Sequence, residues 1–271
     1  MDGFHFGNLA EIRYFLKNIG NEQNSPVISE EKWNAAKKRT LEKYRESICA
    51  DLLKEFFSIF EKTNSTKYRS DLADFVLESN LEDFCGEGKQ TVFVSTIHKA
   101  KGREFDTVFM MLDNEHADTD ERIRKLYVGM TRAKQKLYIH CNTNIFNTGY
   151  NSVKYVADVT KYPLPEEITL QLTFHDVYLN FFKDKKERIL RMHSGTPLLY
   201  NDGYLYNCSS EKVAFLSKQA FSKLKEWENK GYAVRSAKAN YIVAWKGQGE
   251  ENETAVLLPE LVLAKTTDDR P

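Results

Sequence analysis

The sequence predicts an α/β fold: a helical segment, then a short parallel sheet, then a smaller α+β or barrel-like module. Near-continuous apolar runs around Val92, Val108 and Leu137 are typical of strands buried on both faces of a parallel sheet. A charged stretch with helical periodicity lies between the last two runs. Five of the six prolines lie at or after Pro163, which indicates a domain boundary near residues 161–167.

The composition is that of a core-forming globular protein. The chain has 271 residues, of which 41% are hydrophobic, enough for one large or two ordinary domains. Its 39 basic and 39 acidic residues balance, so any nucleic-acid site must be a local patch. No apolar run approaches the length of a membrane span. The four cysteines are widely spaced, which is typical of buried free thiols in a reducing compartment. We therefore expect a cytoplasmic protein without a membrane partner.

Residues 1–85 have the pattern of amphipathic helices. Apolar residues from Leu9 to Ile19 repeat every three or four positions, and Gly20 ends the predicted helix. Ser29 is placed to cap a long helix over residues 30–62, whose apolar positions recur about every four residues. We expect this segment to pack on the domain that follows it. A coiled-coil or partner-binding role is the alternative.

Residues 163–271 predict the accessory α+β module. Alternating residues 168–172 predict a strand, and Asp202-Gly203 lies between aromatic flanks as in a hairpin. Ser217 is placed to cap a helix, and two further strands are predicted at residues 239–247 and 254–265. We recognise no catalytic constellation in this module and expect it to bind nucleic acid or a partner protein.

The stretch from Val92 to Cys141, which lies within a predicted domain of residues 86–162, contains two motifs. The first, TIHKAKGREF, occupies residues 96–105 and follows the first predicted strand. The second, YVGMTRA, occupies residues 127–133 at the end of the charged helix. Ligands of open α/β sheets bind outside the carboxyl ends of strands, so the first motif lies where a ligand is expected.

These motifs resemble motifs V and VI of the UvrD/Rep/PcrA family of superfamily 1 DNA helicases. They occur in the family order, and the resemblance covers roughly Leu72 to Cys141, although Arg103 stands where the family has Leu. No GxxxxGK[ST] phosphate loop occurs in the sequence, and we interpret the partial match at residues 86–89 as a turn. The resemblance implies that residues 86–162 belong to a second RecA-like motor domain, with the ATP-grasping motor domain upstream in the same protein.

Arg132 is the candidate catalytic residue. On a helical wheel over residues 120–133 it falls opposite the apolar side, so it does not serve that core. A guanidinium remains charged and can contact phosphate oxygens at two points. The alternative is a solvated Arg that stabilises the carboxyl end of the helix. The resemblance makes Arg132 the arginine finger for the γ-phosphate of ATP.

The resemblance also implies roles for the first motif. Glu104 would accept hydrogen bonds from ribose hydroxyls, and Gly102 would form a tight turn where a side chain blocks close approach of the ligand. Thr96, His98 and Lys101 would contact single-stranded DNA or couple it to the nucleotide. A surface Glu104 paired with a Lys is the alternative.

Acidic residues and one His between Asp113 and Glu121 suggest a metal cluster at first sight. We expect instead a solvated linker whose last carboxylates favour the start of the following helix, and no metal site.

The resemblance implies a carboxyl-terminal fragment of an ATP-dependent DNA helicase. The intact enzyme would use ATP and Mg²⁺ and move along single-stranded DNA, whereas the fragment alone is expected to be inactive because it lacks the phosphate loop. The alternative is a non-catalytic adaptor that retains the motor fold to bind nucleic acid or protein.

Overall fold

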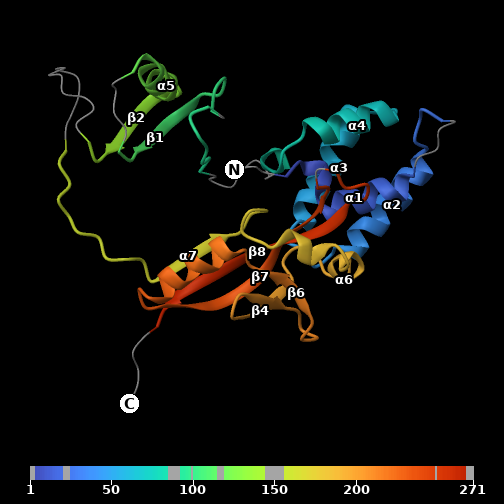
Figure 1. Ribbon diagram of the computed structural model, residues 1–271. Coiled ribbons are helices and arrows are strands. Elements are labelled where there is room, and N and C mark those ends of the chain that lie inside the picture. The colour runs from blue at the N-terminus through green and yellow to red at the C-terminus, as the bar shows by residue number, and fades with distance from the viewer. Residues whose placement is uncertain are drawn as a thin grey trace. The chain divides into compact units, whose positions relative to one another are not determined.

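The computed structural model describes residues 4–20, 25–84, 92–98, 100–114, 119–143, 156–247 and 249–266 (Figure 1). The chain divides into two compact units. The larger unit combines residues 1–89 with residues 163–271, and the smaller unit consists of residues 90–162.

Helices form the amino-terminal part of the larger unit. Gly20, with φ of +67°, follows the first α-helix, and the Ser29 hydroxyl accepts a hydrogen bond from the Lys32 amide at 3.3 Å at the start of the second. Both predicted helix boundaries are confirmed. The elements are η1 (Phe6–Asn8), α1 (Ala10–Ile19), α2 (Glu30–Lys43), α3 (Ala50–Thr63), α4 (Arg69–Glu78) and η2 (Leu81–Phe84).

The single long helix predicted over residues 30–62 is wrong, because α2 and α3 are separate helices. Ser47 lies between them, and its hydroxyl donates to Glu11 Oε1 at 2.8 Å and accepts from the Cys49 amide at 3.1 Å. Short polar side chains that bond to nearby backbone compete with helix formation. The apolar spacing continues through the break, so periodicity alone did not reveal it.

A curled six-stranded antiparallel sheet forms the rest of the larger unit, with strand order β3-β8-β7-β4-β5-β6. Irregularities in the β7 register near residues 234–236 and 239–241 bend this long strand. Helix α7 packs against β7 (Figure 1). The elements are β3 (Glu167–Gln171), η3 (Leu179–Phe182), α6 (Lys186–Leu190), β4 (Pro197–Asn201), β5 (Tyr204–Tyr206), β6 (Lys212–Phe215), α7 (Lys218–Glu228), β7 (Tyr232–Trp245) and β8 (Thr254–Lys265).

Local signals in this module are confirmed. Asp202 and Gly203 have φ of +45° and +82° and join β4 to β5 as a two-residue hairpin turn. Ser217 caps α7 by accepting a hydrogen bond from the Ala220 amide at 3.2 Å.

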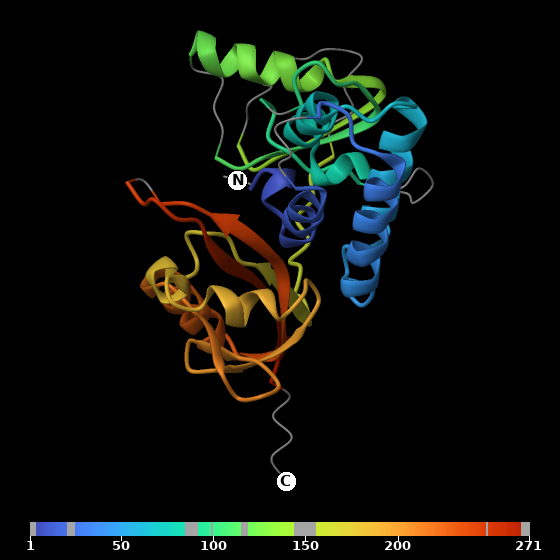
Figure 2. The same cartoon turned by 90° about the vertical axis from the view of Figure 1, so that its right-hand side faces the viewer.

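The helices and the sheet share one apolar core. Leu9, before α1, forms a bridge with Val243 near the end of β7, and both residues are buried. Figure 2 shows helix α1, in dark blue, beside the red strands of the sheet. The Ile48 amide donates to the Ser194 carbonyl at 3.0 Å, a second link between the two halves of the unit. The amino-terminal helices therefore pack on the carboxyl-terminal module. Their packing on the motor domain remains a prediction.

The smaller unit contains a parallel strand pair connected through a helix. Strands β1 (Phe105–Leu112) and β2 (Ala133–Cys141) pair in parallel, and α5 (Asp120–Met130) connects them. Met110 and Leu112 of β1 and Leu126 of α5 form its small core. The fold is therefore mixed α/β, with a parallel and an antiparallel sheet.

Two expectations about the parallel sheet are wrong. Residues 92–96 are not a strand, and the Val94 side chain is 87% exposed. The strands are not buried on both faces within this unit, because Phe109 and Met111 of β1 are 62% and 76% exposed. On this open face the Phe109 ring stacks on Tyr138 of β2, with ring centroids 4.8 Å apart.

Cysteines are less uniformly buried than predicted. Cys49 is buried, and burial, with a contribution from nearby Glu11, raises the pKa of its thiol to about 12. Cys141 and Cys208 are free and exposed. In the described part of the chain, no helix combines the length and apolar character needed to span a membrane.

We predict that Gly195→Ala destabilises the larger unit by about 2–4 kcal/mol. Gly195 has φ of +96°, and a Cβ there would lie 2.6 Å from Ile48 Cγ2, so the variant combines backbone strain with a clash at the link between helices and sheet. Chemical denaturation measures the loss in the free energy of unfolding.

Gly249→Ala is the matched control. Gly249 has φ of +80°, but no atom lies within 4 Å of its added Cβ, so only the backbone cost of about 1 kcal/mol is expected. Equal losses in the two variants would show that the contact between Gly195 and Ile48 does not constrain the unit.

Candidate nucleotide and nucleic-acid site

Arg132 connects the two sequence motifs. It lies just after α5, and its Nη1 donates to the Arg103 carbonyl at 3.1 Å, while the Phe105 amide donates to the Arg132 carbonyl at 2.8 Å. One bond comes from the side chain and the other from the main chain. The end of the YVGMTRA motif is thereby held against the turn of the TIHKAKGREF motif.

The Arg132 guanidinium also stabilises the end of α5. Its Nε donates to the Val128 carbonyl at 2.9 Å, and its Nη2 donates to the Thr131 hydroxyl at 3.0 Å. The carbonyls of the last helical turn lack partners within the helix, so this contact satisfies one of them. The three bonds use three of the five N–H groups of the side chain, and two remain for a further acceptor.

Glu104 lies in the turn that precedes β1. Its carboxylate is 3.7 Å from Lys134 Nζ, and both side chains are more than half exposed. The pairing with a lysine that we gave as the alternative is therefore present. An exposed pair at this distance is worth little in free energy, so it does not prevent Glu104 from binding another group.

Gly102 has φ of +85°, which confirms a turn that favours glycine. No atom lies within 4 Å of a Cβ built at this position. Glycine is therefore favoured here by its backbone conformation. It is not required by a close neighbour in this structure. Contact of Gly102 with ATP remains a prediction.

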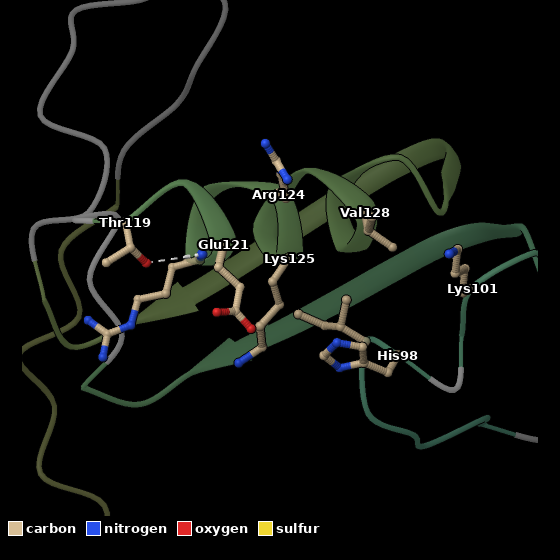
Figure 3. A pocket seen from close by; sticks show the side chains of 9 residues that line it. His98, Lys101, Thr119, Glu121, Arg124, Lys125 and Val128 are labelled. Carbon is tan, nitrogen blue, oxygen red and sulfur yellow. Dashed lines mark hydrogen bonds between the residues drawn. The ribbon is translucent and has the colours of Figure 1, made fainter.

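A hollow of about 850 Å³ lies between the first motif and α5 (Figure 3). His98 and Lys101 line it from the motif, and Val128 lines it from the helix. Thr96 is exposed in the segment that leads to this hollow. Lys99 lies outside the described residues.

Three cationic residues of α5 were missed by sequence reasoning. Arg122, Arg124 and Lys125 line the same hollow as His98 and Lys101, with Glu121 as the carboxylate among the lining residues. Figure 3 shows Lys125 and Glu121 extending from the same side of the helix, whereas Arg124 projects away. The basic run RIRK in residues 122–125 could have indicated these cations from the sequence. The hollow that they line is formed only by the fold.

The position of the site on the sheet differs from the expectation. Glu104 directly precedes β1 and Arg132 directly precedes β2, so both lie at the amino ends of the two parallel strands. We expected the ligand beyond the carboxyl end of a strand over residues 92–96, and this strand does not form. The helix α5 between the strands reverses the chain direction and returns Arg132 to the edge where β1 begins.

The acidic stretch before α5 is only partly described, because residues 115–118 lie outside the described residues. Thr119 caps the helix by accepting a hydrogen bond from the Arg122 amide at 3.3 Å, and Asp120 and Glu121 occupy the first turn. Within the described ranges, no group of three His, Cys, Asp or Glu side chains has the geometry to hold a metal ion.

Comparison with known proteins identifies the region that carries this site. Residues 14–144 match the family model described as UvrD-like helicase C-terminal domain. The sequence of this part of the chain is similar to that of UvrD-like helicase C-terminal domains. The match starts within α1, so it extends well before Leu72, where sequence reasoning placed the resemblance.

Relatives of this domain are DNA helicases. The ATP-dependent DNA helicase PcrA of Bacillus subtilis is 27% identical over 289 aligned positions, which cover 95% of this chain and 36% of PcrA. A probable DNA helicase II homolog of Rickettsia felis is 34% identical over 133 positions, 42% of this chain and 20% of that protein. The ATP-dependent DNA helicase Rep of Buchnera aphidicola is 34% identical over 113 positions, 37% of this chain and 16% of Rep.

The chain spans about a third of the length of PcrA and smaller shares of the other two relatives. No solved structure matches it significantly.

We predict that Arg132→Ala loosens the turn between the two motifs of the UvrD-like domain. Loss of the bonds to Val128 and Arg103 should cost about 1 kcal/mol locally and raise amide hydrogen exchange at Phe105 roughly fivefold. Arg124→Ala, the same change on an exposed residue of α5, should leave this rate unchanged. A Phe105 rate that is the same in both variants would contradict a structural role of the guanidinium.

Proposed function

We propose that the chain is the carboxyl-terminal part of an ATP-dependent DNA helicase and contributes the second, RecA-like half of its motor. The observation that carries the proposal is the bond of Arg132 to the Arg103 carbonyl, which joins the two motifs in a UvrD-like domain. In the cell it would act in the cytoplasm on single-stranded DNA, with the upstream motor domain of the same protein as its partner.

Arg132 is proposed as the arginine finger. Two of its N–H groups are not used by the bonds to Val128, Arg103 and Thr131, and two are what a guanidinium needs to contact a phosphate at two points. The carbonyl of Val128 holds Nε, which limits the rotation of the side chain. The guanidinium is thereby preorganised, so less order has to be imposed when the nucleotide arrives.

Glu104 and Gly102 are proposed to complete the ATP site. Glu104 would exchange its long contact with Lys134 for ribose hydroxyls. Glu104 precedes β1 and Arg132 precedes β2, so both lie at one edge of the sheet. ATP and Mg²⁺ would serve the intact enzyme, in which the metal neutralises charge on the phosphates. The Mg²⁺ ligands are expected in the upstream motor domain.

Coupling to DNA is proposed for Thr96, His98 and Lys101. His98 and Lys101 line the hollow against α5, and Arg132 lies at the end of the same helix. A change in the contact between Arg132 and the nucleotide would therefore shift α5 and, through it, the position of His98 and Lys101. The cations of α5 add phosphate-binding groups to this hollow, as expected for a local patch on a chain without net charge.

One observation favours the alternative function, a non-catalytic adaptor that retains the motor fold. The guanidinium of Arg132 already has three protein acceptors, which is also what a purely structural arginine would show. Catalysis by the intact protein separates the two functions.

We predict that Arg132→Ala lowers the DNA-stimulated ATPase rate of the full-length protein by about a thousandfold or more, with DNA binding retained. Arg132→Lys should be similarly impaired, because an ammonium cannot hold the turn and contact a phosphate in the same geometry. Arg39→Ala, the same change at an exposed arginine of α2 that does not line the hollow, is the control and should keep the parental rate. Melting temperatures of all variants exclude unfolding as the cause.

An unchanged rate in Arg132→Ala, or no ATPase in the parent, would establish the adaptor instead. The chain of residues 1–271 alone is expected to hydrolyse no ATP in the same assay.

We predict that Lys101→Met weakens binding of single-stranded DNA by the full-length protein and lowers the slope of log affinity against log salt by about 0.7, the loss of one phosphate contact. Lys136→Met, an exposed lysine of β2 that does not line the hollow, should leave the slope unchanged. Identical slopes for the two variants would remove Lys101 from the DNA site.

A further inference from the structure

A second hollow, of about 550 Å³, lies in the larger unit where the amino-terminal helices meet the sheet. Its floor is apolar and includes Tyr14 of α1, Leu190 of α6 and Ala255 of β8. None of its lining residues belongs to the unit that carries the helicase motifs. The volume is within the range of small-molecule sites, roughly 300–1,000 Å³.

Cations from three helices surround this floor. Arg13 and Lys17 come from α1, Lys43 is the last residue of α2, and Lys186 is the first residue of α6. Glu253 is the carboxylate among the lining residues, and it accepts a hydrogen bond from Arg13 at 2.8 Å. The three lysines therefore leave an excess of positive charge in a chain whose net charge is zero.

Lys43 lies over two aromatic rings, which attract its charge, but it is also partly buried, which disfavours that charge. Its Nζ lies 4.1 Å from the centre of the Tyr14 ring and 5.0 Å from that of Tyr44. Burial lowers the pKa of Lys43, buried Glu11 acts in the opposite direction, and the charge of Lys17 lowers the pKa further. An anion between the two ammonium groups would relieve their repulsion.

We propose that this hollow binds the phosphate of a nucleotide through Lys17 and Lys43, with the base or sugar over the apolar floor. The proposed ligand therefore has a compact group of high negative charge, the phosphate, attached to a ring. Each ammonium offers three N–H donors, so Lys186 keeps two of them when it donates to the Glu253 carbonyl at 2.9 Å. A free nucleotide and the phosphorylated end of a strand share this chemistry.

The test is calorimetric titration of the whole chain with thymidine monophosphate, with a 5′-phosphorylated oligothymidylate and with inorganic phosphate. The double variant Lys17→Met, Lys43→Met should lose at least about tenfold in nucleotide affinity, since two charge-assisted contacts disappear while the apolar stems remain. Lys38→Met is the control, because Lys38 is also on α2 but is 77% exposed and does not line the hollow.

Each probe decides one point. Tight binding of the mononucleotide supports a free nucleotide as the ligand, and preference for the oligonucleotide supports a strand end. Inorganic phosphate binding as tightly as either would overturn the role of the apolar floor. Equal affinities of the parent and the double variant would overturn the site. The variant Lys17→Met, Lys43→Met changes no residue assigned to the helicase site, and the ATPase assay uses other variants, so failure of one proposal is distinguishable from failure of the other.

A measurement on the unaltered chain guards against a double variant that does not fold. Lysine amines of the unaltered chain are acylated with and without bound nucleotide. Bound nucleotide should protect Lys17 and Lys43, but not Lys38, when acylation is followed by peptide mass spectrometry. Protection that is equal at all three lysines, or at none, would overturn the proposal.

Discussion

Burial of apolar side chains from both ends of the chain in a single core is the constraint on which the larger unit depends. Leu9 pairs with Val243, and the turn that carries Ile48 bonds to Ser194. Neither the helices nor the sheet can cover these apolar surfaces alone, so the two segments are stable only together. The unit with the helicase motifs is therefore an insertion, in sequence, between two halves of one core.

Within that insertion, the bonds of Arg132 link residues that the sequence separates. The side chain reaches back to the Arg103 carbonyl and the main chain accepts from Phe105, so the ends of both motifs share one geometry. An arginine suits this position because its donors are fixed in a plane and several can be used at once. The same feature allows one residue to stabilise a helix end and keep two N–H groups outside these bonds.

The parallel strand pair is an unusual structure to find by itself. Parallel sheets are normally covered on both faces, yet Phe109, Met111 and Tyr138 are exposed within this unit, where stacking of two rings removes part of the apolar surface from water. The apolar runs of both strands fit burial on two faces, whereas the unit by itself covers one.

The sequence by itself determined the family, the mixed α/β class and the local boundaries. Ser29, Gly20, the Asp202-Gly203 turn and Ser217 act through neighbours a few residues away, so their effects could be predicted from the sequence. Arg132 and Glu104 could be selected as candidates because the two motifs that contain them resemble helicase motifs in sequence and order.

Only the tertiary structure decided what depends on contacts between distant segments. These are the break at Ser47, where Glu11 of another helix accepts a hydrogen bond, and the absence of a strand at Val94. They also include the grouping of Arg122 and Lys125 with His98, and the lysines around the second hollow. Periodicity reports which face of an element is apolar, but the surface it meets is chosen by the packing of the whole chain.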